Sequence, residues 1–242
     1  MVRQLVGSMC VRYTLHKTDA ALGAISRALG VPLEAPDWAA PRYNVTLTNT
    51  MPVVACAAQQ PAVRAMRWGL VPVSDRGKSR PRLLANARSE TAAKLPAFRQ
   101  GVAERRCLVP ANGFYEWRSS GGVKWPHLFT LRDEEPFAFA GIWEPAFEEL
   151  PETYCLLTTA PNDLVARVHD RMPVILTAET MPRWLGDRPL AAEELRLLVS
   201  PIASERMESR PVSRFVSSSR NEGPGCLAPP ENPRPEPELD FT

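Results

Sequence analysis

The sequence is poor in lysine and lacks long apolar runs. Lysine occurs only at positions 17, 78, 94 and 124, so arginine supplies 25 of the 29 basic residues. No stretch approaches the roughly 18 consecutive apolar residues that a membrane-spanning helix needs. Residues 1–8 hold one arginine and, after Met1, three scattered apolar residues, too few for the apolar segment of a signal peptide. We therefore expect a cytoplasmic protein.

Cysteine pairs with the spacing of metal ligands are absent as well. The five cysteines, at 10, 56, 107, 155 and 226, are odd in number, widely spaced and without a Cys-x-x-Cys pair. This pattern argues against both a zinc site and a disulfide framework. We expect Cys107 and Cys155, which lie in apolar runs, to be small buried hydrophobic residues in a reducing compartment.

The net charge of +2 does not by itself indicate a nucleic-acid partner. Arginine offers a planar, bidentate match to phosphate and stacks on aromatic rings and bases, so the arginine excess suits such a partner. A genome composition that favours arginine codons explains the same excess equally well. Composition alone therefore leaves the partner open.

Short strand-like and helix-like segments alternate along the 242 residues, a length that fits one large domain or two small ones. Strands are predicted at 11–15, 53–57, 65–71, 107–110, 113–118, 127–131, 137–143, 154–159 and 174–176. Helices are predicted at 20–29, 89–94, 99–104, 164–168, 180–185 and 191–198. This pattern predicts the α+β class, as a single domain with a mainly antiparallel, barrel-like β core and a few flanking helices.

The C-terminal end has a different composition. Proline and acidic residues crowd together from Pro224 onward, which predicts disorder. We place the end of the domain at residue 229 and assign 230–242 to a disordered proline-rich, acidic tail.

Five stretches carry chemically capable groups in strand and turn contexts. Glu116 lies between aromatic residues, and His169 belongs to a group of a base, an acid and an arginine at the end of a short helix. The stretches are Met9-Cys10-Val11-Arg12-Tyr13, Asn86-Ala87-Arg88-Ser89-Glu90-Thr91, Asn112-Gly113-Phe114-Tyr115-Glu116-Trp117, His169-Asp170-Arg171-Met172-Pro173, and the serine- and arginine-rich segment from Pro211 to Asn221.

Together these stretches resemble the SRAP family, the SOS-response-associated peptidases, from Met9 to about Pro229. The further matching pieces are Pro41-Arg42-Tyr43-Asn44, Met66-Arg67-Trp68-Gly69-Leu70-Val71-Pro72, Arg106-Cys107-Leu108-Val109-Pro110 and Leu156-Leu157-Thr158-Thr159-Ala160. Any single piece is weak evidence, but so many in the right order are specific. The resemblance implies the SRAP fold for residues 9–229.

The resemblance also implies an activity. SRAP proteins sense abasic sites in single-stranded DNA and crosslink covalently to them, which shields the lesion during the DNA damage response. The family's reactive residue is an N-terminal cysteine exposed by methionine removal, and it matches Cys10. The family's other functional residues match Asn86, Arg88, Glu116 and His169. An enzyme of this crosslinking, lyase-like type is implied, with autoproteolytic peptidase activity as a further property.

The chemistry explains why these residue types are needed. A free α-amine has a reference pKa of about 7.7–8.0, so part of it is neutral and can attack the sugar aldehyde. The cysteine thiolate then closes a five-membered thiazolidine, a ring that only an N-terminal cysteine can form. We expect Glu116 to act as general acid/base, His169 to shuttle a proton and Asn86 to orient the cysteine or the sugar.

DNA contacts are expected around these catalytic residues. Arg12 and Arg88 are expected to hold phosphates on either side of the lesion. The candidates for stacking on bases or wedging the strand are Trp68, Phe98, Arg99 and Trp117. A place in the core is an equally good interpretation for the two tryptophans. The resemblance implies no metal or organic cofactor and no membrane partner, and we expect a monomer that is nucleoid-associated when bound to DNA.

Two departures from the family pattern matter. Val11 stands where the family has glycine, and a β-branched residue does not readily adopt the positive φ that glycine permits. Residues 1–8 form an N-terminal extension, and while they remain attached the nitrogen of Cys10 is an amide instead of an amine. The extension is a misassigned start, an expression tag, or a propeptide that the protein removes itself.

Two rival functions stay open. A cysteine peptidase acting on itself or on other proteins predicts turnover of peptide substrates. A non-covalent reader of modified or single-stranded DNA predicts salt-sensitive binding that survives Cys10→Ser unchanged.

Overall fold

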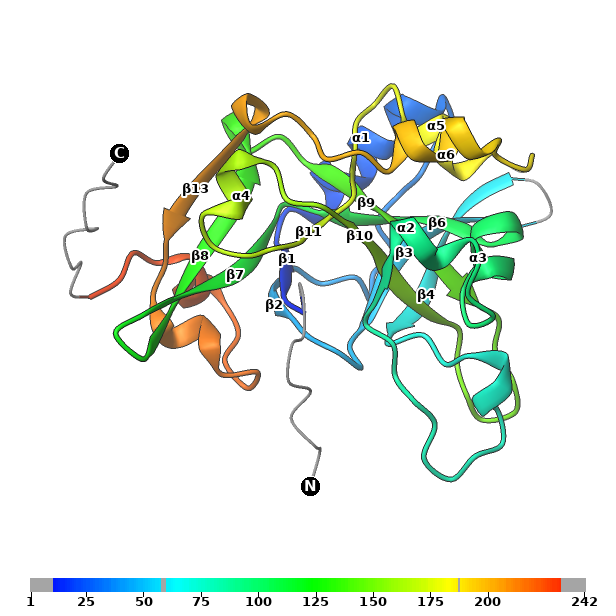
Figure 1. The fold of residues 1–242 in the computed structure, drawn as a ribbon, viewed down its shortest axis with the longest axis horizontal. Coiled ribbons are helices and arrows are strands. Elements are labelled where there is room, and N and C mark those ends of the chain that lie inside the picture. The colour runs from blue at the N-terminus through cyan, green and yellow to red at the C-terminus, as the bar shows by residue number, and fades with distance from the viewer. Residues whose placement is uncertain (1–10, 58–59, 187, 232–242) are drawn as a thin grey trace.

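The computed structural model describes residues 11–57, 60–186 and 188–231, and short strands dominate this part of the chain (Figure 1). The strands are β1 (Tyr13–Leu15), β2 (Arg42–Val45), β3 (Thr50–Ala57), β4 (Gln60–Trp68), β5 (Asn86–Arg88), β6 (Arg106–Ala111), β7 (Gly113–Ser120), β8 (Val123–Leu131), β9 (Phe137–Glu144), β10 (Thr153–Thr159), β11 (Met172–Pro173), β12 (Ile175–Leu176) and β13 (Met207–Pro211). The helices are α1 (Thr18–Leu29), α2 (Ser89–Ala92), α3 (Arg99–Glu104), α4 (Asp163–Ala166), α5 (Met181–Leu185) and α6 (Ala192–Leu198). The predicted α+β class is confirmed.

The smaller sheet has five strands in the order β13-β8-β7-β1-β2, and each neighbouring pair is antiparallel. Its centre is the hairpin of β7 and β8, in which Glu116 lies opposite His127 and Arg118 opposite Trp125. The short strand β1 joins the free edge of β7 through Tyr13 opposite Phe114. The N-terminal strand is therefore held against the hairpin that carries Glu116.

The larger sheet closes on itself. Neighbouring pairs run in the order β10-β4-β3-β6-β9, and β9 pairs in turn with β10, which completes a ring of five strands. The pairs of β10 with β4 and with β5 are parallel, and the other pairs are antiparallel. This arrangement agrees with the mainly antiparallel, barrel-like core that the sequence predicts.

Successive residues of the ring strands alternate between two hydrophobic clusters, as the two-residue repeat of a strand requires. In β6, Cys107 and Val109 belong to one cluster and Leu108 to the other. In β9, Phe139 and Ala140 divide in the same way. The helices α1, α3, α5 and α6 contribute buried side chains to the second cluster, namely Leu22, Ile25, Val102, Trp184 and Leu198. Buried on both faces, these strands read as continuous apolar runs.

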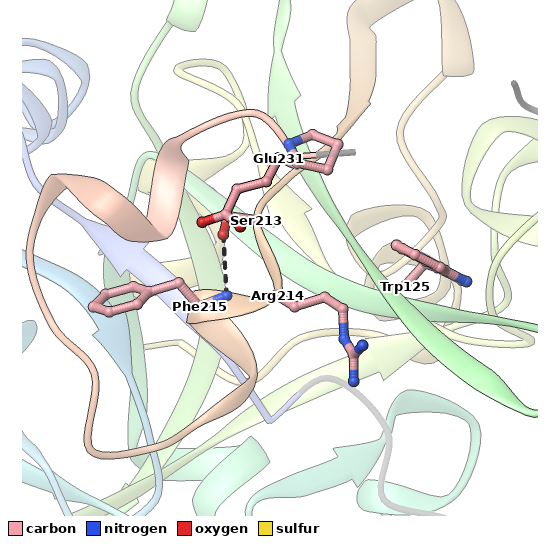
Figure 2. A pocket seen from close by; sticks show the side chains of 6 residues that line it. Trp125, Ser213, Arg214, Phe215 and Glu231 are labelled. Carbon is pink, nitrogen blue, oxygen red and sulfur yellow. Dashed lines mark hydrogen bonds between the residues drawn. The ribbon is translucent and has the colours of Figure 1, made fainter. Parts of the chain in front are cut away.

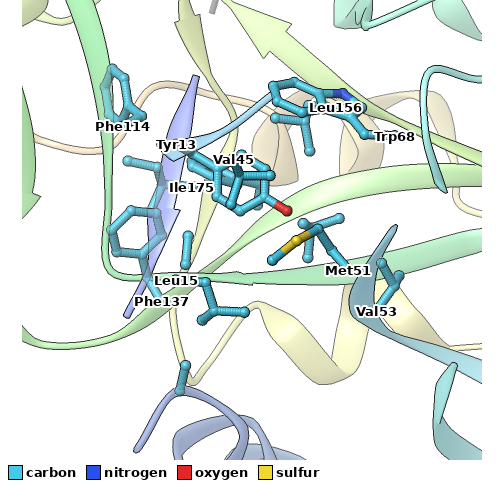
Figure 3. Packing of buried hydrophobic residues seen from close by; sticks show 14 of the residues in the cluster. Tyr13, Leu15, Val45, Met51, Val53, Trp68, Phe114, Phe137, Leu156 and Ile175 are labelled. Carbon is cyan, nitrogen blue, oxygen red and sulfur yellow. The ribbon is translucent and has the colours of Figure 1, made fainter. Parts of the chain in front are cut away.

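The first cluster joins the two sheets into one core (Figure 3). The ring of Tyr13 in β1 lies 5.2 Å from that of Trp68 in β4 and 5.7 Å from that of Phe139 in β9. The hydroxyls of Tyr13 and Tyr154 form a buried hydrogen bond of 2.8 Å. The residue after Arg12 is thus fixed in the core, which limits where Arg12 can lie.

Most predicted elements are present, with changed ends. The helix predicted at 20–29 begins at Thr18 and ends where Gly30 adopts the left-handed conformation (φ 68°) and its N–H bonds the carbonyl of Ser26. The three-residue strand β5, the two-residue strand β11 and the strand β13 were not predicted. None of the helices in the described part of the chain is long and apolar enough to cross a membrane.

The predicted disorder from Pro224 onward is wrong for the first residues of that segment. A 3₁₀ helix spans Pro224–Leu227, and Cys226 within it is fully buried. The N–H of Ser213 bonds the carbonyl of Ala228 (2.7 Å), and the Arg210 guanidinium bonds that of Leu227 (2.8 Å). The prediction failed at these residues because their proline content carries no information about the burial of Cys226. Most of the predicted tail, 232–242, and the extension 1–8 lie outside the described residues.

Candidate functional site

A pocket of about 550 Å³ lies where four segments of the chain meet. These segments are the residues before β1, the β7–β8 hairpin, the turn after α4, and a 3₁₀ helix at Arg214–Ser217. The lining residues are Val11, Arg12, Glu116, Trp117, Gly122, Val123, Lys124, His169, Arg214 and Ser217. The structure therefore brings Arg12, Glu116, Trp117 and His169 together from positions up to 157 residues apart (169 minus 12). We call this space the central pocket.

Arg12 is held at the wall of the central pocket by several acceptors. Its Nη1 atom donates to Asn44 Oδ1 (2.9 Å) and to the carbonyl of Val216 (2.7 Å), and its guanidinium lies 5.6 Å from the centroid of the Trp117 ring. Burial lowers the pKa of Arg12 from its usual value, but an arginine stays protonated at neutral pH. A fixed cation therefore faces the pocket.

Asn44 organises the same wall, and sequence reasoning gave it no role. Its Nδ2 atom donates to the carbonyls of Val216 (3.3 Å), Ser218 (2.9 Å) and Asn221 (2.8 Å), while its Oδ1 accepts from Arg12. The Trp117 indole N–H adds a bond to Ser217 Oγ (3.1 Å). The serine- and arginine-rich segment, singled out from the sequence, is thus tied to β2 and β7. The sequence feature that could have pointed to Asn44 is its place in Pro41-Arg42-Tyr43-Asn44, one of the pieces that resemble the SRAP family.

Glu116 reaches the pocket from the middle of β7. The Glu116 residue is only 4% exposed, and Tyr115 before it is fully buried in the cluster with Val216 and Cys226. His127 lies opposite it on β8 and is 8% exposed. A carboxyl group in such a protected position at a pocket wall can exchange a proton with a bound ligand. The sequence identified Glu116, but not its neighbour His127.

His169 lies in the turn after α4, where its backbone N–H bonds the carbonyl of Val165 (2.9 Å). Its Nδ1 atom accepts from the backbone N–H of Arg171 (3.1 Å) and lies 3.0 Å from Asp170 Oδ1. The first contact needs an unprotonated Nδ1, and the second becomes attractive only once Nδ1 is protonated. Neutral His169 therefore carries its proton on Nε2, and the imidazolium gains Asp170 as a partner.

Asn86 and Arg88 lie on β5, opposite Leu156 and Thr158 of β10, and neither lines the central pocket. A bidentate ion pair connects their stretch to that of His169. Arg171 donates from Nη1 and Nη2 to the two carboxylate oxygens of Glu90 (2.6 and 2.8 Å), and from Nη2 to the carbonyl of Thr158 (2.7 Å). This pair fixes the turn that carries His169 relative to α2.

Two of the proposed DNA contacts do not suit the structure. Trp68 is fully buried, stacks 6.4 Å from Tyr154 and donates its indole N–H to the carbonyl of Ala85 (3.0 Å). Phe98 is 8% exposed and belongs to the cluster under the helices. Neither ring has a free face for a base, so we withdraw both as stacking candidates. Arg99 is exposed at the start of α3 but does not line the central pocket.

Three of the described cysteines, Cys107, Cys155 and Cys226, have a raised thiol pKa and are therefore poor nucleophiles. Cys107 and Cys155 are fully buried, as predicted, and burial raises the pKa of both thiols. Burial also raises the pKa of Cys226 to about 11. Cys10 lies outside the described residues; Val11, to which it is bonded, lines the central pocket. Among the described residues, no group of three His, Cys, Asp or Glu side chains could hold a metal ion.

Residues 9–219 match the family "SOS response associated peptidase (SRAP)". The chain belongs to the SRAP family.

Relatives of this SRAP protein are named for the processing of abasic sites. The chain is 35% identical over 193 residues to "Abasic site processing protein YoqW" of Bacillus subtilis, and the match covers 77% of this chain and 85% of the relative. It is 32% identical over 218 residues to "Abasic site processing protein YoaM" of the same species, with 88% and 95% covered. "Abasic site processing protein HMCES" of Gallus gallus is 31% identical over 238 residues, with 82% and 70% covered.

Solved structures share the SRAP protein's fold. A protein from Bacteroides thetaiotaomicron superposes with a TM-score of 0.76 at 25% identity, covering 91% of this chain and 99% of that one. A phage-related protein from Bordetella bronchiseptica gives 0.68 at 26% identity, covering 88% and 99%. The two-sheet architecture is therefore common to these proteins.

Proposed function

We propose that this SRAP protein crosslinks covalently to abasic sites in single-stranded DNA, through Cys10 as its N-terminal residue. The observation that carries the proposal is the central pocket, which Val11, Glu116 and His169 line together with the cation of Arg12. A reactive N-terminus bonded to Val11 has an acid/base group, an imidazole and a phosphate ligand within one cavity. The names of its relatives support a DNA lesion as the substrate.

The proposed reaction uses both groups of an N-terminal cysteine. The neutral α-amine of Cys10 adds to the aldehyde carbon of the ring-opened sugar, and loss of water gives an imine. The thiolate then adds to the imine carbon, the nitrogen takes up a proton, and a C–S bond closes the thiazolidine. The net change is one water lost per crosslink, without an oxidant or reductant.

The pocket residues suit the proton transfers of this sequence. Glu116 protonates the leaving hydroxyl during imine formation and takes a proton back afterwards. His169, whose neutral form carries its proton on Nε2, exchanges a proton with the sugar oxygen. Arg12 pairs with a phosphate beside the lesion, and Trp117, stacked under Arg12, closes the pocket. The family resemblance adds Asn86, to orient the cysteine or the sugar, and Arg88, to hold a second phosphate, although neither lines the central pocket.

A protein that begins at Cys10 tests the proposal directly. Incubated with a single-stranded oligonucleotide that contains an abasic site, it is expected to give an adduct that survives denaturing electrophoresis. Cys10→Ala is expected to abolish this adduct. Cys10→Ser keeps the amine but lacks the thiol, so its adduct should require reduction by borohydride to survive.

The full chain with residues 1–9 still attached is the matched control. Its Cys10 nitrogen is an amide, so we expect no adduct unless intact mass shows that the preceding residues have been removed. Absence of an adduct from protein with a verified N-terminal Cys10 would overturn the proposal. Mass spectrometry of the full chain over time also tests self-cleavage, the peptidase activity that the family name suggests.

A further inference from the structure

A second pocket, of about 400 Å³, adjoins the central pocket (Figure 2). It is lined by Trp125, Ser213, Arg214, Phe215, Pro230 and Glu231. Arg214 also lines the central pocket, so the two spaces meet at this side chain. We propose that this second pocket, the flanking pocket, binds the base of a nucleotide next to the lesion in the same DNA strand. This inference rests on the function proposed above, which supplies the strand.

Trp125 and Arg214 together form a surface suited to a base. The Arg214 guanidinium lies 5.9 Å from the centroid of the Trp125 ring, and Trp125 is partly exposed. In Figure 2 the Arg214 side chain extends on the Trp125 side of the pocket, whereas the Phe215 ring lies on the side away from Trp125. An aromatic ring beside an arginine is how single-stranded nucleic acid is held without sequence preference, because every base has a π face.

The strand register places this surface next to the reacting groups. On the β7–β8 hairpin the pair Arg118–Trp125 lies two residues along from the pair Glu116–His127. Residues two apart share a face, and a rise of about 3.4 Å per residue separates the pairs by about 7 Å. When a sugar contacts Glu116, the next nucleotide of the strand can therefore reach the Trp125 ring and the Arg118 cation.

The charges favour a base over a phosphate inside the flanking pocket. The cation of Arg214 is shared by the two pockets, Lys124 lines the central pocket, and the anion of Glu231 lines only the flanking pocket. A phosphate is attracted to the border and repelled from Glu231. A strand that crosses the border with its phosphate at Arg214 thus turns its uncharged base toward Trp125.

The test compares Trp125→Ala with Phe147→Ala in the full chain. Phe147 is a matched control, because it is 38% exposed, carries the Arg76 guanidinium 5.4 Å from its ring and lines neither pocket. Fluorescence anisotropy with an undamaged single-stranded oligonucleotide is expected to show about 5- to 150-fold weaker binding for Trp125→Ala. Phe147→Ala is expected to bind as the wild type does, and Trp125→Phe to retain most of the affinity.

A second set of oligonucleotides separates stacking from other effects. A central abasic site carries, on its 5′ or its 3′ side, either a normal nucleotide or a baseless tetrahydrofuran unit. On the side that enters the flanking pocket, removal of the base should weaken wild-type binding and leave Trp125→Ala unchanged. Arg214→Gln should also lower the slope of affinity against salt by about one charge.

Equal affinities of Trp125→Ala and wild type, with equal thermal stability, would overturn the inference. So would a Trp125→Ala deficit that persists when both flanking bases are absent. Failure of the proposed function gives a different result, since the wild type then forms no adduct. The anisotropy difference on undamaged DNA is read independently of that adduct.

Discussion

Asn44 connects the N-terminal segment to the serine- and arginine-rich segment through both ends of its amide. Asn44→Asp keeps the acceptor for Arg12 but removes the donor that three carbonyls share, and Asn44→Ala removes both. Leaving buried polar groups unsatisfied costs about 1–3 kcal/mol. We therefore expect both variants to unfold at lower denaturant concentration, with Asn44→Ala the less stable. Urea unfolding at neutral pH checks this, and an Asn44→Ala midpoint equal to wild type contradicts it.

Glu116 is the second residue whose change has a definite expected result. Glu116→Gln keeps the shape but cannot exchange a proton, so the rate of adduct formation should fall by about 10²- to 10⁴-fold. Binding of undamaged DNA should stay within error of wild type. Single-turnover adduct formation measures the rate, and Glu208→Gln on β13, exposed beside Thr130, serves as the control. An unchanged rate would remove Glu116 from the mechanism.

Sequence reasoning singled out residues whose type suggests chemistry, and their roles stay predictions; it missed residues that only packing defines. Glu116 and His169 were predicted from their stretches, and the structure places both at one pocket. Trp68 was a stacking candidate because a buried and an exposed tryptophan look alike in sequence. Asn44 was missed because the carbonyls that accept from its amide lie 172 to 177 residues away along the chain. No local pattern contains that information.

At the scale of elements, the ion pair of Arg171 with Glu90 positions the turn of His169 relative to α2. Glu90 is half exposed, so Glu90→Gln should lower stability by about 1 kcal/mol or less. A shifted His169 is expected to slow adduct formation, by up to about 10²-fold for a displacement near 1 Å. The control is Glu193→Gln, which breaks the exposed bidentate pair with Arg196 on α6. If both variants react at the same rate, the pair has no positioning role.

The ion pairs of Asp75, in the segment before β5, should make the free energy of unfolding depend on pH in the acid range. Asp75 is 1% exposed and accepts from Lys78 Nζ (2.6 Å) and from Arg82 Nε (2.6 Å). These bonds, those of Arg82 first, hold the pKa of the Asp75 carboxyl well below its ordinary value. Because the folded-state pKa is the lower one, this stabilisation is present above about pH 4 and is lost as the pH falls further. Asp75→Asn should therefore be less stable than wild type at pH 7, with the gap closing toward pH 2 in urea unfolding.

The existence of most strands could be predicted, but their partners could not. Alternating and apolar runs identified β6 to β10, since these strands bury both faces or one face against a large core. The strands β5 and β11 have three and two residues, too short for any period to show. The parallel pairing of β10 with β4 joins residues 86 positions apart, Thr153 and Arg67. Such long-range pairing is decided by the packing of the whole core.

At the scale of the whole molecule, the site exists because two sheets share one core. The ring of strands holds Tyr13, and with it β1, against the hairpin of β7 and β8. The chain then returns after β13 to cover that hairpin with the segment that carries Arg214 and Ser217. The central pocket is the space left between these layers. Its residues are therefore scattered in sequence, and its integrity depends on the C-terminal segment.

Truncation of the C-terminus tests this dependence. A chain ending at Glu231 keeps the 3₁₀ helix Pro224–Leu227, so we expect its thermal midpoint to equal that of the full chain. A chain ending at Gly223 loses the buried Cys226, the acceptor of Arg210 and that of Ser213. Loss of one buried heavy-atom group costs about 0.5–1.5 kcal/mol, and hydrogen-bond donors left without acceptors add to this cost, so the midpoint should fall by several degrees.

The same two truncations separate stability from function. Cys226 belongs to the hydrophobic cluster of Tyr115, Leu128, Val212 and Val216, which supports the segment that lines the central pocket. We therefore expect the chain ending at Gly223, measured well below its midpoint, to bind single-stranded DNA more weakly than the chain ending at Glu231. Equal binding by the two would show that Asn44 and Trp117 hold this segment in place without the 3₁₀ helix. A loss of binding by both would instead assign the DNA contact to residues after Glu231.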